Sequence, residues 1–197
     1  MVSPKKEDWI VSTNNEIGKL SQVVLPHMAY FIGTMFFINH IYIPQCRTAT
    51  YLHIFSEENS LKVDKKRIRW NFGGNIINYS GELITKTADL VAVKCLLNRT
   101  ISTPGSLFMT NDPKTNYLGT PLDRYEYMHI PVKYISNTIM KQYNLSSIAH
   151  KVHVVVEIQK GMYGLTQAVI IYNKRLIDNL ATPGYHKAKH TPGLFTH

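Results

Sequence analysis

The amino-acid sequence predicts a mixed α+β fold, in which helices and strands follow one another without the strict alternation that builds a parallel sheet. Two segments carry apolar residues at helical spacing, and several short runs rich in β-branched and aromatic residues are typical of strands. Of the 197 residues, 44% are hydrophobic and 18% are charged. A chain of this length and composition can bury a core in one or two domains.

The first half of the chain contains two predicted helices. Asp8–Leu20 forms an amphipathic pattern with Trp9, Ile17 and Leu20 as core positions. The second helix covers Thr87–Asn98, with Thr87 as its N-cap. Strands are expected in four ranges, with a turn at Gly73-Gly74-Asn75 before the last one: Phe31–Ile43, Thr48–Phe55, Lys65–Phe72 and Ile76–Tyr79.

The second half combines two further strands with one long helix. A short strand over Ser106–Met109 is expected to run towards Asp112, and another strand covers His153–Ile158. A turn that begins at Gly161 leads into a helix over Gln167–Leu180. The apolar positions that recur at helical spacing in it are Val169, Tyr172, Leu176 and Leu180.

No charged residue occurs between Leu20 and Cys46, which is a length that could cross a membrane. Pro26, His27 and Gly33 interrupt the segment, and its many aromatic and β-branched residues favour two buried strands around a turn at Gly33 and Thr34. We therefore expect no membrane span.

The chain has only two cysteines, Cys46 and Cys95, too few for a disulfide framework or a CxxC zinc site. No apolar stretch follows the lysines near the N-terminus, so no signal peptide is expected. An intracellular location, cytoplasmic or nuclear, is the simplest interpretation, and secretion is not expected.

The formal net charge is +9, and the basic excess is spread along the whole chain. Such an excess fits a phosphate-rich partner such as nucleic acid, because each neutralised phosphate releases counterions. A basic protein without any such partner is the alternative. The histidines His186, His190 and His197, with His150 and His153 earlier, also raise a metal site, but no closed set of four ligands is visible.

Two places carry candidate functional residues. Asp112 follows an apolar run but precedes Pro113, so the residues alone favour an ordinary turn over a metal ligand. Arg67 and Arg69 lie two positions apart and share one face of a strand, where they could meet a triphosphate with Lys66 nearby. The alternative for these basic residues is a charged, solvated edge strand.

Seven segments in order resemble the reverse transcriptase of Ty1/copia-type LTR retrotransposons, and the likeness covers nearly the whole chain. The segments are NNEIGKLSQ, GTMFFI with CRTATYLHI, RIRWNFGGN, YSGELITKTADLVAVKCLLN, MTNDPKTNYLGTPLDRYEYM, KGMYGLTQA and GYHKAKHTPGLFTH. The resemblance implies a fingers-like region over residues 1–105 and the first half of a palm over residues 106–197. It also implies RNA-directed DNA polymerisation by two-metal nucleotidyl transfer, with an RNA/DNA template-primer and a dNTP as partners.

The resemblance also assigns roles to individual residues. Asp112 would be catalytic and would bind Mg²⁺. Tyr117 would lie under the incoming sugar and Gln167 near the nucleotide, while Arg67 and Arg69 would hold the triphosphate. The alternative for Tyr117 is a plain core aromatic. Nucleic-acid contacts would involve Lys66 and the close backbone approach that Gly161 and Gly164 permit.

The sequence also departs from the family. It contains no Asp-Asp pair, and Pro113, Thr115 and Asn116 replace residues that suit a strand better. One carboxylate cannot fix two metal ions, so we expect a truncated chain that is inactive as a polymerase on its own. The alternatives are a non-catalytic nucleic-acid-binding remnant and a product that does not fold stably.

Overall fold

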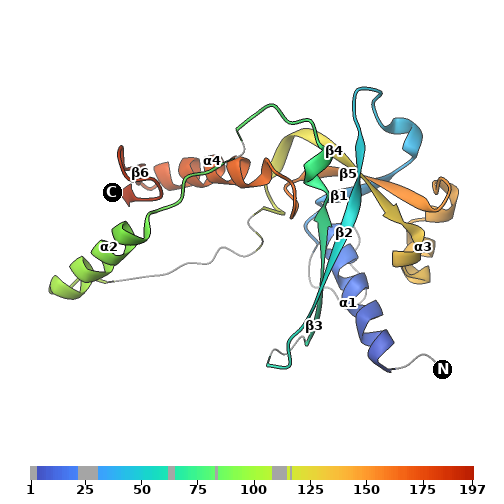
Figure 1. Ribbon diagram of the computed structural model, residues 1–197, viewed down its shortest axis with the longest axis horizontal. Coiled ribbons are helices and arrows are strands. Elements are labelled where there is room, and N and C mark those ends of the chain that lie inside the picture. Colours follow the sequence, from blue (N-terminus) through green and yellow to red (C-terminus); the bar gives the residue numbers. More distant parts are fainter. Residues whose placement is uncertain (1–3, 22–30, 62–64, 83, 108–114, 116) are drawn as a thin grey trace.

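Figure 1 shows the computed structural model, which describes residues 4–21, 31–61, 65–82, 84–107, 115 and 117–197. This part of the chain is mixed α+β, as the sequence predicts. The helices are α1 (Pro4–Leu20), α2 (Leu90–Ser102), α3 (Asn137–Gln142) and α4 (Ala168–Ala181). The strands are β1 (Met35–Ile38), β2 (Ala49–Glu58), β3 (Lys66–Phe72), β4 (Pro121–Pro131), β5 (His153–Lys160), β6 (His186–Lys187) and β7 (Phe195–Thr196). Short 3-10 helices cover His40–Tyr42, Gly74–Ile76, Val132–Tyr134 and Leu145–Ser147.

Five strands form one sheet in the order β1-β5-β4-β2-β3, and β6 pairs with β7 in a separate two-stranded ribbon. All pairs in the large sheet are antiparallel except β2 with β4, which run parallel. The strands β4 and β5 lie between β1 and β2, so segments from both sides of Gly105 build the same sheet.

The hydrophobic core lies on one face of this sheet. Side chains alternate between the two faces of a strand, and the register places Leu52 opposite Phe72 and Thr50 opposite Met128 on the core side. Helix α1 contributes Ile17 and α3 contributes Ile139 to the same core. Other members are Leu20, Met35, Trp70, Ile130, Val154, Val156 and Ile158. In Figure 1, α1 runs beside the β2–β3 hairpin, whereas α2 and α4 extend away from the sheet.

Several predicted elements are confirmed with small shifts at their ends. The predicted helix at Asp8–Leu20 is α1, which begins at Pro4, and both Ile17 and Leu20 are 0% exposed. The strands at Thr48–Phe55, Lys65–Phe72 and His153–Ile158 correspond to β2, β3 and β5. None of the described helices combines the length and the apolar character that a membrane span needs.

Other predictions are wrong in ways that local hydrogen bonds explain. The strand predicted over Phe31–Ile43 is limited to β1, because the Asn39 side chain accepts a hydrogen bond from the Ile41 amide and starts a 3-10 turn. A second 3-10 turn, not a strand, follows Gly73. Helix α2 begins at Leu90 and is capped by the Asp89 carboxylate, so Thr87 is not its N-cap.

The remaining differences concern the second half of the chain. Ser106 and Leu107 are not in a strand, and the rest of that predicted strand lies outside the described residues, as do residues 22–30. In α4 the buried residues are Ala168 and Ile170, whereas Val169 is 41% exposed. The sequence reasoning did not predict β4, the longest strand described, or the short helix α3.

Candidate functional site

The face of the sheet opposite the core carries aromatic and basic side chains. Tyr51, His53 and Phe55 alternate along β2 and are exposed, and the register places Phe55 opposite Arg69 and His53 opposite Asn71. We call this surface the open face and define it by Tyr51, His53, Phe55, Arg67 and Arg69. Aromatic rings can stack on bases, and neighbouring arginines can bind phosphates, so the composition of this face suits nucleic acid.

The outer edge of β3 is closed by side chains of α1. The Ile68 amide donates to the Ser12 hydroxyl at 3.0 Å, and the Trp70 amide donates to the Glu16 carboxylate at 3.4 Å. Two residues further along the strand, the Phe72 amide donates to the backbone carbonyl of Tyr163 at 2.7 Å. These bonds satisfy a row of amides that would otherwise invite another strand, and they hold β3 in place.

Lys66 belongs to this closed edge and not to the open face. Its ammonium group lies 2.7 Å from the Asp8 carboxylate and 5.6 Å from the centre of the Trp9 ring, both on α1. Side chains alternate along β3, so Lys66 points to the other side from Arg67 and Arg69. The structure therefore separates these three basic residues, which the sequence reasoning had grouped around one triphosphate.

Arg67 and Arg69 are both exposed and line one pocket of about 270 Å³. Its other lining residues are Phe55, Ser56, Glu57, Asn71 and Tyr163. The Arg69 guanidinium lies 5.9 Å from the centre of the Tyr163 ring, which restrains the arginine over an aromatic surface. Arg67 lies opposite Glu57 in the register, so a bound anion must compete with a carboxylate for Arg67 but not for Arg69, which is opposite Phe55.

Three half-buried tyrosines lie beside this pocket, and two of them, Tyr117 and Tyr163, also pack against the hydrophobic core. The Tyr117 ring packs edge-to-face against Tyr163 at 6.4 Å and against Tyr172 at 5.6 Å between ring centres. Loss of water and the nearby Tyr117 raise the pKa of the Tyr172 hydroxyl. Arg69, Tyr163 and Tyr117, from three distant segments, thus form one continuous group of contacts.

Gly161 and Gly164 permit close backbone approach, and the backbone they meet is the chain's own. A side chain at Gly161 would place its Cβ 2.4 Å from the Tyr117 carbonyl oxygen. At Gly164, where φ is +83°, a Cβ would lie 2.1 Å from the Phe72 carbonyl oxygen. The turn between these glycines is therefore packed against β3 and against the segment that carries Tyr117, and it brings the two together.

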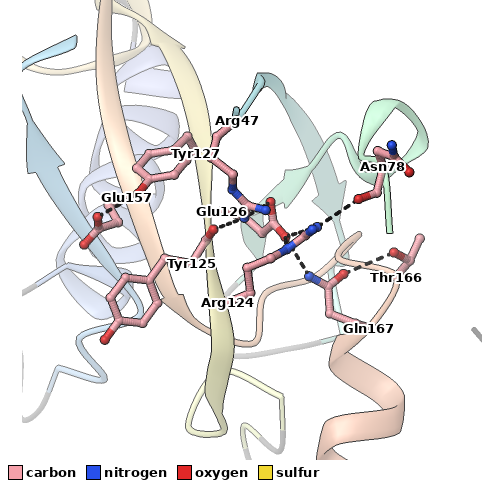
Figure 2. A network of polar contacts seen from close by, with 9 residues as sticks. All are labelled: Arg47, Asn78, Arg124, Tyr125, Glu126, Tyr127, Glu157, Thr166 and Gln167. Carbon is pink, nitrogen blue, oxygen red and sulfur yellow. Dashed lines mark hydrogen bonds and ion pairs between the residues drawn. The ribbon is translucent and has the colours of Figure 1, made fainter. Parts of the chain in front are cut away.

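Gln167 does not face the open pocket. It is 2% exposed, and its amide nitrogen donates a 3.0 Å hydrogen bond to Glu126 of β4, while its amide oxygen accepts from the Thr166 hydroxyl at 3.2 Å. Figure 2 shows Glu126 at the centre of this network, with Arg47 and Arg124 on either side. Each guanidinium lies 2.9 Å from one of the carboxylate oxygens.

The sequence reasoning missed this network, although it connects three parts of the fold. Arg47 precedes β2 and also donates to the Tyr125 carbonyl, while Arg124 reaches the Asn78 carbonyl at 3.1 Å. One buried carboxylate between two arginines leaves the group with a net positive charge. The only signal in the sequence is the alternation of charged and aromatic residues in DRYEY, from Asp123 to Tyr127.

Asp112 and Pro113 lie outside the described residues. Within the described part, no group of three His, Cys, Asp or Glu side chains is placed to hold a metal ion, so no Mg²⁺ chemistry is assigned to those residues. Of the C-terminal histidines, His197 lies 3.0 Å from the Pro183 carbonyl oxygen and packs against Tyr185, whereas His186 is part of β6.

Comparison of the chain with models of protein families, with curated proteins and with solved structures found no match.

Proposed function

We propose that this chain binds nucleic acid and a nucleoside triphosphate on the open face of its sheet, as part of an RNA-directed DNA polymerase of the Ty1/copia type. The observation that carries the proposal is the contact group of Arg69, Tyr163 and Tyr117. These residues come from three of the segments that carry the resemblance, RIRWNFGGN, KGMYGLTQA and MTNDPKTNYLGTPLDRYEYM.

The geometry of the open face suits this role for two physical reasons. A guanidinium offers several donors in a fixed fork that matches phosphate oxygens, and Arg69 is both exposed and restrained by Tyr163. The exposed rings of Tyr51 and Phe55 provide surfaces on which bases can stack without sequence preference. Because α1 closes the edge of β3, both arginines stand on a fixed strand.

The salt dependence of binding to an RNA template annealed to a DNA primer tests the proposal. The protein variants are the wild type, Arg67→Gln/Arg69→Gln and a control with the same change of charge, Lys133→Gln/Lys141→Gln, on the 3-10 turn after β4 and on α3. Loss of two phosphate contacts should reduce the slope of log K against log[salt] by about 1.8. An unchanged slope in the arginine variant would show that the open face does not contact phosphates. The same reduction in the control would show that the effect follows the net charge and is not specific to the open face.

A second candidate is nucleic-acid binding without catalysis, which is favoured because these 197 residues contain no two adjacent aspartates. Primer extension with Mg²⁺ or Mn²⁺ separates the two candidates. Binding without extension supports the non-catalytic role for this chain. Template-dependent extension that disappears in Asp112→Ala would establish catalysis and exclude the second candidate.

A further inference from the structure

Four histidines from distant parts of the chain surround one pocket of about 280 Å³. His40 comes from the 3-10 turn after β1 and His129 from β4. His150 precedes the turn that leads into β5, and His153 is the first residue of β5. The other lining residues are Ile43, Lys151 and Val155. We call this site the four-histidine pocket.

The backbone holds these rings close to one another. The ring centres of His40 and His150 are 4.1 Å apart, and those of His129 and His153 are 5.9 Å apart. His150 and His153 exchange backbone hydrogen bonds of 2.9 and 3.1 Å across a tight turn. Lys151, inside that turn, has a φ of +56°. The turn thereby places two imidazoles and an ammonium group beside the pocket.

The imidazoles have no hydrogen-bonding partner among the described residues, and no hydrogen bond or ion pair involves any of the four side chains there. His40, His129 and His153 are nevertheless half-buried. Among the described residues, none of these ring nitrogens is a fully buried atom without a partner, so they remain accessible to water or to a molecule in the pocket.

The charge that this pocket can develop is positive. Its lining contains no carboxylate. On the neighbouring positions of the sheet, the Glu157 carboxylate is already bonded to the Tyr127 hydroxyl at 3.2 Å and to the Gln159 amide at 2.8 Å. Other charged or titratable groups close by are Tyr42 after His40 and Arg47, which is paired with Glu126. Lys133 lines a neighbouring pocket together with Lys151 and His153, and it adds to the positive charge.

These surroundings disfavour the protonated forms of His129 and His150. Burial, followed by the neighbouring His153 and His150, lowers the pKa of His129. Loss of hydration, followed by His40 and Lys151, lowers the pKa of His150. An anion in the pocket would offset the repulsion between protonated rings, which links its binding to proton uptake.

We propose that the four-histidine pocket binds a phosphate group when its imidazoles are protonated. A protonated imidazole donates from both ring nitrogens, and Lys151 adds a permanent positive charge. A metal ion is a poorer fit, because no three candidate ligands in the described part of the chain are arranged around a common point. The phosphate is either free or the terminal group of a nucleic acid.

Calorimetric titration of inorganic phosphate into the protein at pH 5.5, 6.5 and 7.5, at constant ionic strength, tests this site. We expect binding to strengthen at least about tenfold from pH 7.5 to pH 5.5, because falling pH favours protonated imidazoles and a bound anion favours them further. Proton uptake at pH 6.5, obtained by comparing buffers of different ionisation enthalpy, is also expected. Equal affinity at all three pH values, no binding at millimolar phosphate, or binding without proton uptake would overturn the proposal.

Variants locate the site on the molecule. His129→Gln/His153→Gln should weaken phosphate binding at pH 5.5 at least about tenfold, whereas the control His190→Gln, at an exposed position in the tail, should leave it unchanged. Lys151→Gln provides a milder surface change if the double variant does not fold. Unchanged binding in a folded double variant, or in Lys151→Gln at low salt, would contradict the site.

Two oligonucleotides distinguish the sources of the phosphate. Stronger binding of a 5′-phosphorylated tetranucleotide than of inorganic phosphate identifies the end of a nucleic acid, and equal binding identifies free phosphate. Binding of the 5′-phosphorylated tetranucleotide that is no stronger than that of the same tetranucleotide with a 5′-hydroxyl, together with inorganic-phosphate binding that is insensitive to the His129 and His153 substitutions, would overturn the proposal. The proposed function is tested separately, with the Arg67→Gln/Arg69→Gln variant on a template-primer, whereas this site is tested by the histidine variants with inorganic phosphate, so failure here and failure of the proposed function can be told apart.

Discussion

The Gln167 side chain donates a 3.0 Å hydrogen bond to the Glu126 carboxylate, and each of these residues is 2% exposed. Both polar ends of the Gln167 amide are used, since its oxygen accepts from Thr166. The glutamine that the resemblance places near a nucleotide is thus, in this structure, a support for the buried carboxylate that joins Arg47 and Arg124.

Gln167→Glu is expected to destabilise the fold in a pH-dependent way. At pH 7 it would place a second buried carboxylate beside Glu126 and lower the free energy of unfolding by about 3 kcal/mol. Repulsion raises the pKa of one carboxyl, and once protonated that group can donate to the other. The loss in the free energy of unfolding should therefore become smaller as the pH falls from 7 to 5. Urea unfolding measures it, with exposed Gln142→Glu as control; equal stability at pH 7 would contradict the network.

Glu16→Gln is expected to stabilise the protein at neutral pH. Burial raises the pKa of Glu16 above 4.5, against the opposing effects of Lys19, the Trp70 amide, Arg67 and Arg69. A raised folded-state pKa gives stability below pH 4.5 that is lost as the pH rises through the folded value. Gln keeps an acceptor for the Trp70 amide and carries no charge.

The gain from Glu16→Gln should be of the order of 1 kcal/mol at pH 7 and should fade towards pH 4. Thermal unfolding at the two pH values measures it, with the exposed Glu58→Gln as the matched change of charge. A loss of stability at pH 7 would show that the basic neighbours outweigh the cost of burial.

Gly164→Ala is expected to be far more harmful than Gly105→Ala. Both glycines have positive φ, +83° and +77°, but a Cβ at Gly105 meets nothing within 4 Å, whereas at Gly164 it meets the Phe72 carbonyl. The change at Gly105 should cost about 1 kcal/mol, the penalty of left-handed backbone alone. At Gly164 we expect about 4 kcal/mol or more, or no folded protein. Similar losses measured by denaturant unfolding would argue against the close packing of the turn on β3.

The elements that could be predicted from the sequence are those whose pattern is local. The spacing of Ile17 and Leu20 indicates the core side of α1. The run HVVVEI predicts a strand by its composition alone, without knowledge of the strands beside it. The sequence pattern does not predict strand β4, because prolines stand at both of its ends. In addition, Asp123, Arg124 and Glu126 interrupt the alternation of apolar residues. Glu126 can be buried only because Arg47 and Gln167, both distant in sequence, meet it in the fold.

Only those parts of the candidate site that follow from a local pattern could be predicted from the sequence. The shared face of Arg67 and Arg69 follows from the period of a strand, but the direction of Lys66 depends on where α1 packs. The histidines that are close in sequence, at the C-terminal tail, are used within that tail or exposed. Those that converge, at 40, 129, 150 and 153, are brought together by strand register, which no local pattern encodes.

Equilibrium binding of a deoxynucleoside triphosphate, with Mg²⁺ present, tests the role of the open face most directly. The three proteins are the wild type, Arg67→Gln/Arg69→Gln and the control Lys133→Gln/Lys141→Gln. The arginine variant should bind at least about tenfold more weakly, because each charge-assisted hydrogen bond contributes about 1.5–3 kcal/mol, and the control should match the wild type. Equal affinity in all three proteins, or no binding by the wild type, would contradict a nucleotide site on this face.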